Sequence, residues 1–189
     1  YNQIMLDEFK LSEVRAGRGW HGNKQAMQFG LKYFNVATLK NLNLQLEFNY
    51  VRPYTYSHYN TLENYAHYNQ PLAHPMGANF WEALAFLNYR YKSVFVEARS
   101  SFAIFGADIY DPKTKTYMNY GKDVYRSYYS RPNIDGSGDY GYFVGQGLKT
   151  ALLINDLRLL YLVNPKTNLN IEAGVTQRVT HTGVTGTAL

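Results

Sequence analysis

Cysteine is absent from the 189 residues, so disulfide scaffolds and cysteine-based zinc sites are excluded. Charged residues are also scarce, at 17%, and no run of Lys and Arg accompanies the formal net charge of +5. Proteins that follow a phosphate backbone carry such runs, so nucleic acid is not expected as a partner. No stretch reaches the roughly 18 to 20 continuous apolar residues of a membrane-spanning helix. The composition is instead rich in aromatic residues, which make up 16% of the chain and include 19 Tyr.

Strict alternation of apolar and polar residues is the clearest pattern in the chain. In LNLQLEFNY, residues 42–50, every second residue is apolar and the intervening ones are Asn, Gln or Glu. The same period recurs in residues 81–91, 94–104 and 169–178, and more briefly in 27–33, 157–163 and 2–11. A period of two predicts strands with one apolar and one polar face.

The connections between these stretches alternate in length. Short ones at 35–41, 91–93 and 164–168 alternate with long, polar, aromatic ones at 13–26, 52–78 and 107–145. This alternation predicts an antiparallel up-and-down meander with short turns at one end and long loops at the other. The strands match the roughly 9 to 11 residues of a tilted bilayer crossing.

Aromatic residues lie near both ends of the apolar face. Tyr33 and Tyr161 precede short turns, while Trp81 and Phe102 lie near the long loops. Two such rows are typical of a transmembrane β-barrel. The strands of a soluble antiparallel sandwich also alternate apolar and polar residues, but such a fold does not require aromatic residues at both ends of its strands. We therefore predict an all-β fold, an antiparallel up-and-down meander that forms part of a transmembrane barrel in the bacterial outer membrane, with extracellular long loops.

The start and end of the chain guide the prediction of its organisation. It opens on YNQIMLDEF, without the Met, basic segment or apolar segment of a signal peptide, and it begins and ends within a strand pattern. We expect residues 1–189 to form one barrel segment of about seven strands that is the C-terminal part of a longer chain.

The polar face, expected inside the barrel, carries charges of both signs in similar number. A tight turn at 91–93 would place Asn88 opposite Glu97 and Arg90 diagonal to Glu97. Across residues 164–168, Arg158 would lie opposite Glu172 or one diagonal step away. The predicted lumen charge pairs draw on Arg90, Glu97, Arg99, Arg158 and Glu172. A pore that selects one sign of ion would more often carry a ring of like charge. The alternative is that these residues are simply solvated.

The loop at residues 52–78 is crowded with Tyr, His, Asn and Arg. Aromatic rings offer faces on which sugar rings stack, and the polar side chains can hydrogen-bond to sugar hydroxyls. The alternative is a loop that packs on itself and on lipopolysaccharide. The candidate ligand-binding residues are Arg52, Tyr54, Tyr56, His58, His67, Tyr68, Asn69 and His74.

Metal sites have little support in the sequence. The spacing of His58, His67 and His74 matches no familiar zinc motif, so no metal site is predicted from them. NIDGSGDYG places oxygen-bearing side chains at alternate positions, as calcium loops do, but it lacks the bidentate Glu, and a plain turn explains it equally well. The residues concerned are Asn133, Asp135, Ser137 and Asp139. No cofactor is expected, with Ca²⁺ as the remaining alternative.

Catalysis is not indicated either. Ser57 and His58 are neighbours, but adjacent residues in an extended chain point to opposite sides. G-x-S-x-G, H-E-x-x-H and glycine-rich phosphate loops are absent from the sequence. The chain is therefore predicted to be a non-enzyme.

Four stretches together resemble a known family. They are LDEFKLSEVRAGRGWHGNKQ, VRPYTYSHYN, NYAHYNQPLAHPMGANFWE and NPKTNLNIEAGVTQR. They are similar to the outer-membrane barrels of Bacteroidota known as gliding-motility protein RemB, which in turn resemble the capsule-assembly barrel Wzi. Members of that family are several hundred residues long. Outer-membrane barrels usually end on an aromatic residue, whereas this chain stops at TGTAL. The matching loop positions are Arg52, Tyr54, His58, His67, Asn69 and His74.

The resemblance implies a surface-facing barrel that attaches exopolysaccharide or capsule, or that supports adhesion and gliding motility. The predicted function is therefore that of a non-enzymatic outer-membrane barrel with surface-exposed aromatic loops. The alternatives are a substrate-specific porin and a structural accessory subunit of a larger outer-membrane complex. The expected partners are outer-membrane lipid and lipopolysaccharide, surface polysaccharide and other outer-membrane proteins.

Overall fold

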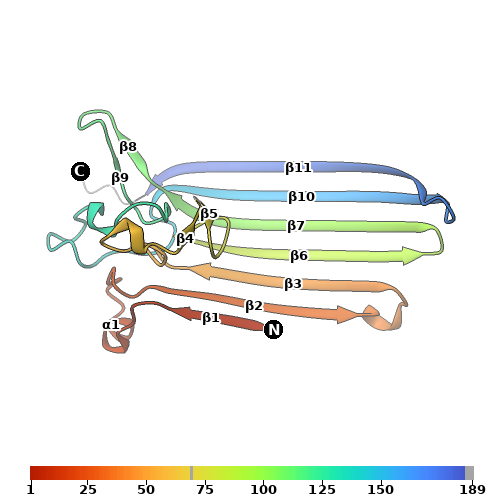
Figure 1. The fold of residues 1–189 in the computed structure, drawn as a ribbon, viewed down its shortest axis with the longest axis horizontal. Coiled ribbons are helices and arrows are strands. Elements are labelled where there is room, and N and C mark those ends of the chain that lie inside the picture. Colours follow the sequence, from red (N-terminus) through yellow and green to blue (C-terminus); the bar gives the residue numbers. More distant parts are fainter. Residues whose placement is uncertain (69, 186–189) are drawn as a thin grey trace.

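A computed structural model describes residues 1–68 and 70–185 of the chain. Seven antiparallel strands form one sheet in the order β1-β2-β3-β6-β7-β10-β11 (Figure 1). Their bounds are β1 (Asn2–Leu6), β2 (Gln25–Phe34), β3 (Leu42–Val51), β6 (Phe80–Tyr91), β7 (Val94–Ala107), β10 (Gly147–Asn164) and β11 (Leu169–Thr185). Each strand pairs with the next one of the sheet along the chain, so the predicted all-β antiparallel meander is confirmed.

Three strands differ from their predicted extent by five residues or more. The strand expected over residues 169–178 continues to Thr185. The strand expected over residues 2–11 ends at Leu6, after which Asp7 and Glu8 break the alternation. The strand expected over residues 157–163 begins ten residues earlier, so that β10 has 18 residues. Its first half contains the run Leu152–Ile154, which is apolar on both faces and therefore shows no period of two.

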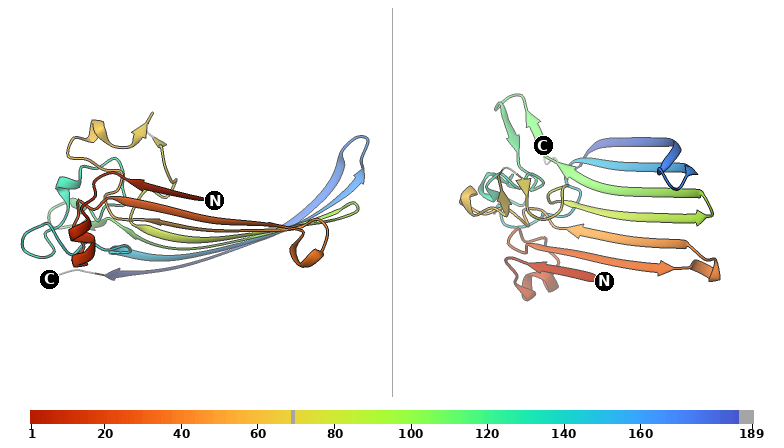
Figure 2. Two further views of the ribbon diagram at one scale, coloured as in Figure 1. Left: turned by 90° about the horizontal axis from the view of Figure 1, so that it is seen from below. Right: turned by 45° about the vertical axis from the view of Figure 1, so that its right-hand side comes forward.

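The long connections contain short elements that the alternation did not predict. They are the helix α1 (Leu11–Ala16), the 3₁₀ turns η1 (Val36–Thr38), η2 (Thr61–Glu63) and η3 (Tyr128–Ser130), and the hairpins β4 (Ala66–His67) with β5 (Gln70–Pro71) and β8 (Ile109–Asp111) with β9 (Thr116–Met118). Apart from η1, these elements gather at one end of the sheet, away from the short turns (Figures 1 and 2). Among the described residues, none of the helices has the length and apolar character needed to span a membrane.

One face of the sheet is apolar and exposed. The register aligns Leu31 with Leu46 and Leu46 with Ala85, so the apolar residues form rows across the strands. Ile171 on β11 is 66% exposed. Near the long loops, the ring centroids of Trp81 and Phe102 lie 5.4 Å apart, which places the predicted aromatic row on this face. Water-exposed apolar area of this extent is unusual for a soluble protein.

The buried core lies on the opposite face, at the loop end only. It consists of Ala26, Val51, Tyr56, Ala78, Phe80 and Val124, flanked by Met5, Met76 and Phe105. Val51 and Phe80 are register partners and lie on the same face as the polar residues Asn49 and Glu82. The polar face therefore becomes apolar at this end, and the segments that follow β3 and β7 fold onto it.

The described strands form an open sheet with β1 and β11 as its two edges. Within residues 1–68 and 70–185, no strand pairs with the outer side of either edge. Closure into a barrel is therefore a proposal.

Candidate functional site

The first residues of the 52–78 loop are buried anchors. The guanidinium of Arg52 donates to the carbonyl of Tyr142 at 2.9 Å. The hydroxyl of Tyr54 donates to the carbonyl of Asn119 at 2.7 Å, and its side chain is 0% exposed. Gly121, at φ 80°, lies against Tyr54, where a Cβ would come within 2.5 Å of the Tyr54 nitrogen. The loop thus begins by threading between the sheet and the 119–146 segment.

This burial corrects the expectation that Arg52, Tyr54 and Tyr56 are displayed on the surface. All three are buried, because their side chains fill the space between the sheet end and the loops. Burial lowers the pKa of Arg52 and raises that of Tyr54 well above its ordinary value. Burial also raises the pKa of Tyr56 to about 12. These residues hold the loop in place rather than present it to solvent.

Asn79 is the hydrogen-bonding centre of the loop end, and sequence reasoning missed it. Its Nδ2 lies 2.9, 2.9 and 3.0 Å from the carbonyl oxygens of Gly106, Tyr120 and Gln146. Its Oδ1 accepts from the N–H of Gly145 at 2.8 Å. The residue is fully buried and has a φ of 59°, which Asn tolerates better than most residues. An Asn directly before an apolar strand was the only signal in the sequence.

A hollow of about 600 Å³ lies between the loop and the polar face of β1, β2 and β3. Its size falls within the roughly 300–1,000 Å³ range of small-molecule sites. The polar and aromatic groups that line it are Gln3, Gln28, Asn49, Tyr56, Tyr65 and His74. The rings of Tyr56 and Tyr65 lie 6.0 Å apart with a tilt of 30°. The hollow therefore combines amide groups with tyrosine rings, as the chemistry of sugar binding requires.

His74 forms one wall of the hollow and is fixed at both ring nitrogens. Its Nδ1 accepts from the backbone N–H of Met76 at 3.2 Å, so Nε2 carries the proton of the neutral ring. That Nε2 lies 3.2 Å from Glu82 Oε2. Glu82 also accepts from the hydroxyl of Ser101 at 3.0 Å. The end of the loop that leads into β6 is thereby tied to β6 and β7.

The three histidines of the loop lie apart. His58 Nε2 lies 3.2 Å from Asp7 Oδ2, whereas His67 packs on Tyr68 with ring centroids 4.2 Å apart. Tyr68 is 89% exposed, so these two side chains lie on the surface, as predicted for the displayed part of the loop. The predicted site residue Asn69 lies outside the described residues.

Asp7, Glu8 and His58 offer ligand atoms within 4.8 Å of one another. The ammonium of Lys24 lies 2.7 Å from Glu8 Oε1 and 3.9 Å from Asp7 Oδ2, and its side chain is fully buried. A buried cation therefore already neutralises these carboxylates at the place where a metal ion would sit.

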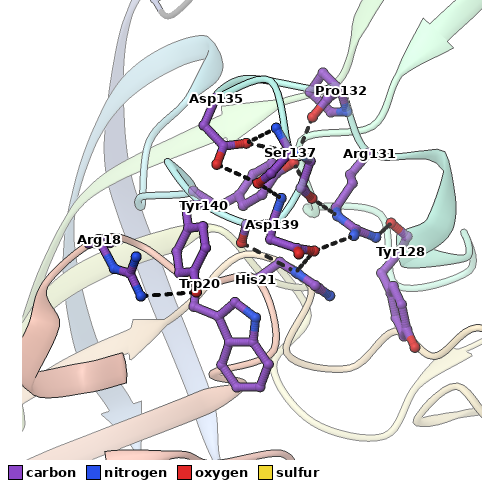
Figure 3. Close-up of polar contacts among 12 residues, drawn as sticks. Arg18, Trp20, His21, Tyr128, Arg131, Pro132, Asp135, Ser137, Asp139 and Tyr140 are labelled. Atoms are coloured by element: carbon purple, nitrogen blue, oxygen red, sulfur yellow. Dashed lines mark hydrogen bonds and ion pairs between the residues drawn. The ribbon is translucent and has the colours of Figure 1, made fainter. Parts of the chain in front are cut away.

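A second polar cluster joins residues 18–21 to residues 128–142 (Figure 3). His21 Nδ1 lies 3.3 Å from the carbonyl oxygen of Asp139, and the guanidinium of Arg131 donates to the Asp139 carboxylate at 3.2 Å. Arg18 donates to the hydroxyl of Tyr140 at 3.0 Å. Burial, aided by the charge of Arg131, lowers the pKa of His21 below its ordinary value. This cluster fixes the backbone of the longest loop.

The stretch considered as a calcium loop forms a turn. The Asp135 carboxylate accepts from the hydroxyl of Ser137 at 2.6 Å and from the N–H of Gly138 at 2.8 Å. Asn133 Nδ2 donates to the carbonyl of Gly136 at 3.1 Å. Side chains of this kind build turns by bonding to their own backbone.

The predicted charge pairs on the polar face form only in part. Arg158 lies 3.6 Å from Glu172, one diagonal step away as expected. Glu97 is the register partner of Asn88, also as expected, but it accepts from Arg99 at 2.9 Å. The predicted partner Arg90 instead lies over the ring of Phe95 at 4.9 Å, because Phe95 is directly opposite it in the register.

No family model, curated protein or solved structure matches this chain. The resemblance to the RemB and Wzi barrels of Bacteroidota therefore stays a prediction.

Proposed function

We propose that this chain is a non-enzymatic segment of a bacterial outer-membrane β-barrel that binds surface polysaccharide. The exposed apolar face supports the membrane setting, because lipid chains would cover this surface and remove it from contact with water. The polar face would then line the interior, and the loops that fold onto it would lie at the extracellular end. Attachment of exopolysaccharide or capsule, or support of adhesion and gliding, is the role that the family resemblance implies.

The observation that carries the polysaccharide proposal is the hollow beneath the 52–78 loop. Tyr65 is partly exposed there, so its ring can stack on the apolar face of a sugar. Gln28 donates to Glu47 at 3.0 Å, which leaves its amide oxygen able to accept from a hydroxyl. Neutral, hydroxyl-rich ligands suit such a lining better than charged ones do.

The polysaccharide proposal is tested by replacing Tyr65 with Ala in the full-length protein in its native cells. Retention of surface polysaccharide should fall roughly tenfold, the effect of losing one well-packed aromatic contact. The matched control is Tyr117→Ala, because Tyr117 is similarly exposed but lies on the β8–β9 hairpin. Equal retention in the two variants would count against the hollow as the binding site.

The membrane setting is tested by gel migration of the outer-membrane fraction with and without boiling. A folded barrel should change its migration on boiling. A band above 21.8 kDa, the mass of this chain, would support a longer protein of which residues 1–189 are one part. A water-soluble protein with heat-insensitive migration would contradict the proposal.

A structural role in a larger complex is the second candidate, because of a polar row on the apolar face. Ser100 donates to Asn155 Oδ1 at 2.8 Å, and Asn155 Nδ2 donates to Gln177 Oε1 at 3.2 Å. The row crosses β7, β10 and β11 and ends at the sheet edge. Polar side chains that face lipid are costly, and the hydrogen bonds within this row end at Gln177 on the edge strand β11, so the row favours a protein neighbour at that edge. Copurification of a stoichiometric partner after mild detergent extraction would support this role.

The porin alternative has less support, because loops fold onto the polar face at one end of the sheet. Steady single-channel current in planar bilayers would favour it.

A further inference from the structure

Tyr59 and Tyr129 form an exposed aromatic corner. Tyr59 belongs to the 52–78 loop and Tyr129 to η3, which lies 70 residues further along the chain. Their ring centroids lie 5.2 Å apart and their planes are perpendicular, at 90°. The side chains are 65% and 71% exposed, respectively, so both rings keep broad free surface.

The backbone that carries the two rings is held firmly. The hydroxyl of Ser127 donates to the carbonyl of Tyr59 at 2.7 Å. The Ser127 hydroxyl oxygen also accepts from the backbone N–H of Tyr129 at 3.2 Å. The buried Asn119 donates to the carbonyl of Ser127 at 3.0 Å. A single serine therefore ties both loops together, and a buried amide fixes that serine. Such preorganisation reduces the entropy that binding would otherwise cost.

Polar side chains line a hollow beside the corner. This hollow of about 830 Å³ is lined by Tyr59, Asn60, Thr61, Glu63, Ser127, Tyr129 and Ser130. Asn60 Oδ1 accepts from the N–H of Leu62 at 3.1 Å, which orients the side chain, and its NH₂ group donates to no other residue among 1–68 and 70–185. The carboxylate of Glu63 forms no ion pair with any residue in the described part of the chain.

We propose that this corner is a binding subsite for neutral pyranose units, a proposal that rests on the polysaccharide function proposed above. The ring faces stack against the C–H faces of a sugar, while Asn60 donates to its hydroxyls and Glu63 accepts from them. The negative charge of Glu63 repels uronic acids, whose carboxylates would have to lie beside it. The subsite therefore selects neutral over acidic glycans.

The test uses the full-length protein in detergent and measures its affinity for maltohexaose, cellohexaose, mannohexaose and hexagalacturonate. We expect wild type to bind at least one neutral hexamer, and Tyr59→Ala and Tyr129→Ala each to weaken that binding roughly tenfold. The replacements Tyr59→Phe and Tyr129→Phe should retain most of the affinity, because the ring face remains. Glu63→Gln should raise the affinity for hexagalacturonate and change the neutral hexamers little.

The matched control is a second exposed tyrosine pair. The rings of Tyr110 and Tyr117 lie 5.1 Å apart and are about half exposed, on the β8–β9 hairpin. Alanine at either position should leave binding unchanged.

The outcomes separate the two proposals. If wild type binds a hexamer and the Tyr59 and Tyr129 variants bind it with the same affinity, the corner is not the subsite, but the proposed polysaccharide function stands. An equal loss of hexamer affinity in the Tyr110 and Tyr117 variants would also overturn the proposed subsite, because the loss would then not be specific to Tyr59 and Tyr129. If wild type bound none of the four hexamers, both proposals would fail.

Discussion

His74 Nε2 lies 3.2 Å from Glu82 Oε2, and this contact joins the last part of the 52–78 loop to strand β6. The ring of His74 also packs on Phe80, with centroids 4.6 Å apart, so the histidine is held by both a polar and an apolar neighbour. Loop and sheet thus meet through residues that the sequence places in different segments. The consequences for stability can be measured.

Replacing His74 with Ala should loosen the loop over the hollow. Glu82 would lose a donor while staying largely buried, which should cost about 1–2 kcal/mol. The rate of limited proteolysis within residues 52–78 should rise correspondingly. His67→Ala is the control, because His67 is exposed and packs only on Tyr68 among the ring contacts found in the described residues. Equal proteolysis rates in the two variants would contradict the anchoring role of His74.

Asn79→Ala should be among the most damaging single changes in the chain. It would leave buried carbonyl groups without donors and would place Ala at a positive φ, with a combined cost of about 3 kcal/mol or more. The midpoint temperature of the heat-induced gel shift would report the loss. Asn168→Ala is the control, since Asn168 also has a positive φ, at 53°, but lies exposed in the turn before β11. Similar midpoints would show that only the backbone conformation matters.

Lys24→Met should destabilise the packing of the β1–β2 connection. The change removes a buried ammonium that lies 2.7 Å from Glu8 and 4.4 Å from the ring of Tyr128. The Glu8 side chain is 43% exposed, so water compensates part of its charge, and the loss of this charged hydrogen bond should cost about 1.5–3 kcal/mol. Adding Glu8→Gln should restore part of the loss. Lys10→Met is the control, because Lys10 forms a surface pair with Glu13 and should cost less than about 1 kcal/mol.

Mild acid should weaken the cluster around His21. The pKa of this residue is lowered below 6.5 in the folded state, mainly by burial and then by the charge of Arg131, while Asp139 and Glu8 act in the opposite direction. The unfolded chain therefore binds a proton as the pH falls through 6.5, before the folded chain does. Stability is fully present above that pH and declines below it.

The midpoint of the gel shift, measured from pH 7.5 down to pH 5.5, should therefore fall in wild type. In His21→Gln the fall should be smaller, because the group that titrates has been removed. Identical pH profiles for the two proteins would exclude His21 as the source.

The strand pattern was predictable because period-two alternation is a local property. Residues 42–50 alternate strictly, and β3 spans Leu42–Val51. Short turns also set the register, so that Asn88 lies opposite Glu97 as expected. The same register places Phe95 opposite Arg90, but Glu97 also lies within reach of that side chain, and only the packing decided that Arg90 lies over the Phe95 ring.

What the sequence by itself determined is the meander, with one apolar and one polar face, and the end at which the long loops gather. Only the tertiary structure decided which loop residues are accessible. Tyr54 and Tyr59 lie five positions apart in the same aromatic run, yet one is 0% and the other 65% exposed. The sequence alone does not show which of the two tyrosines is buried, because a tyrosine side chain can pack in a core through its ring or face water through its hydroxyl. The difference comes from Gly121, Asn119 and Ser127, which the fold brings to this loop from more than 60 residues away.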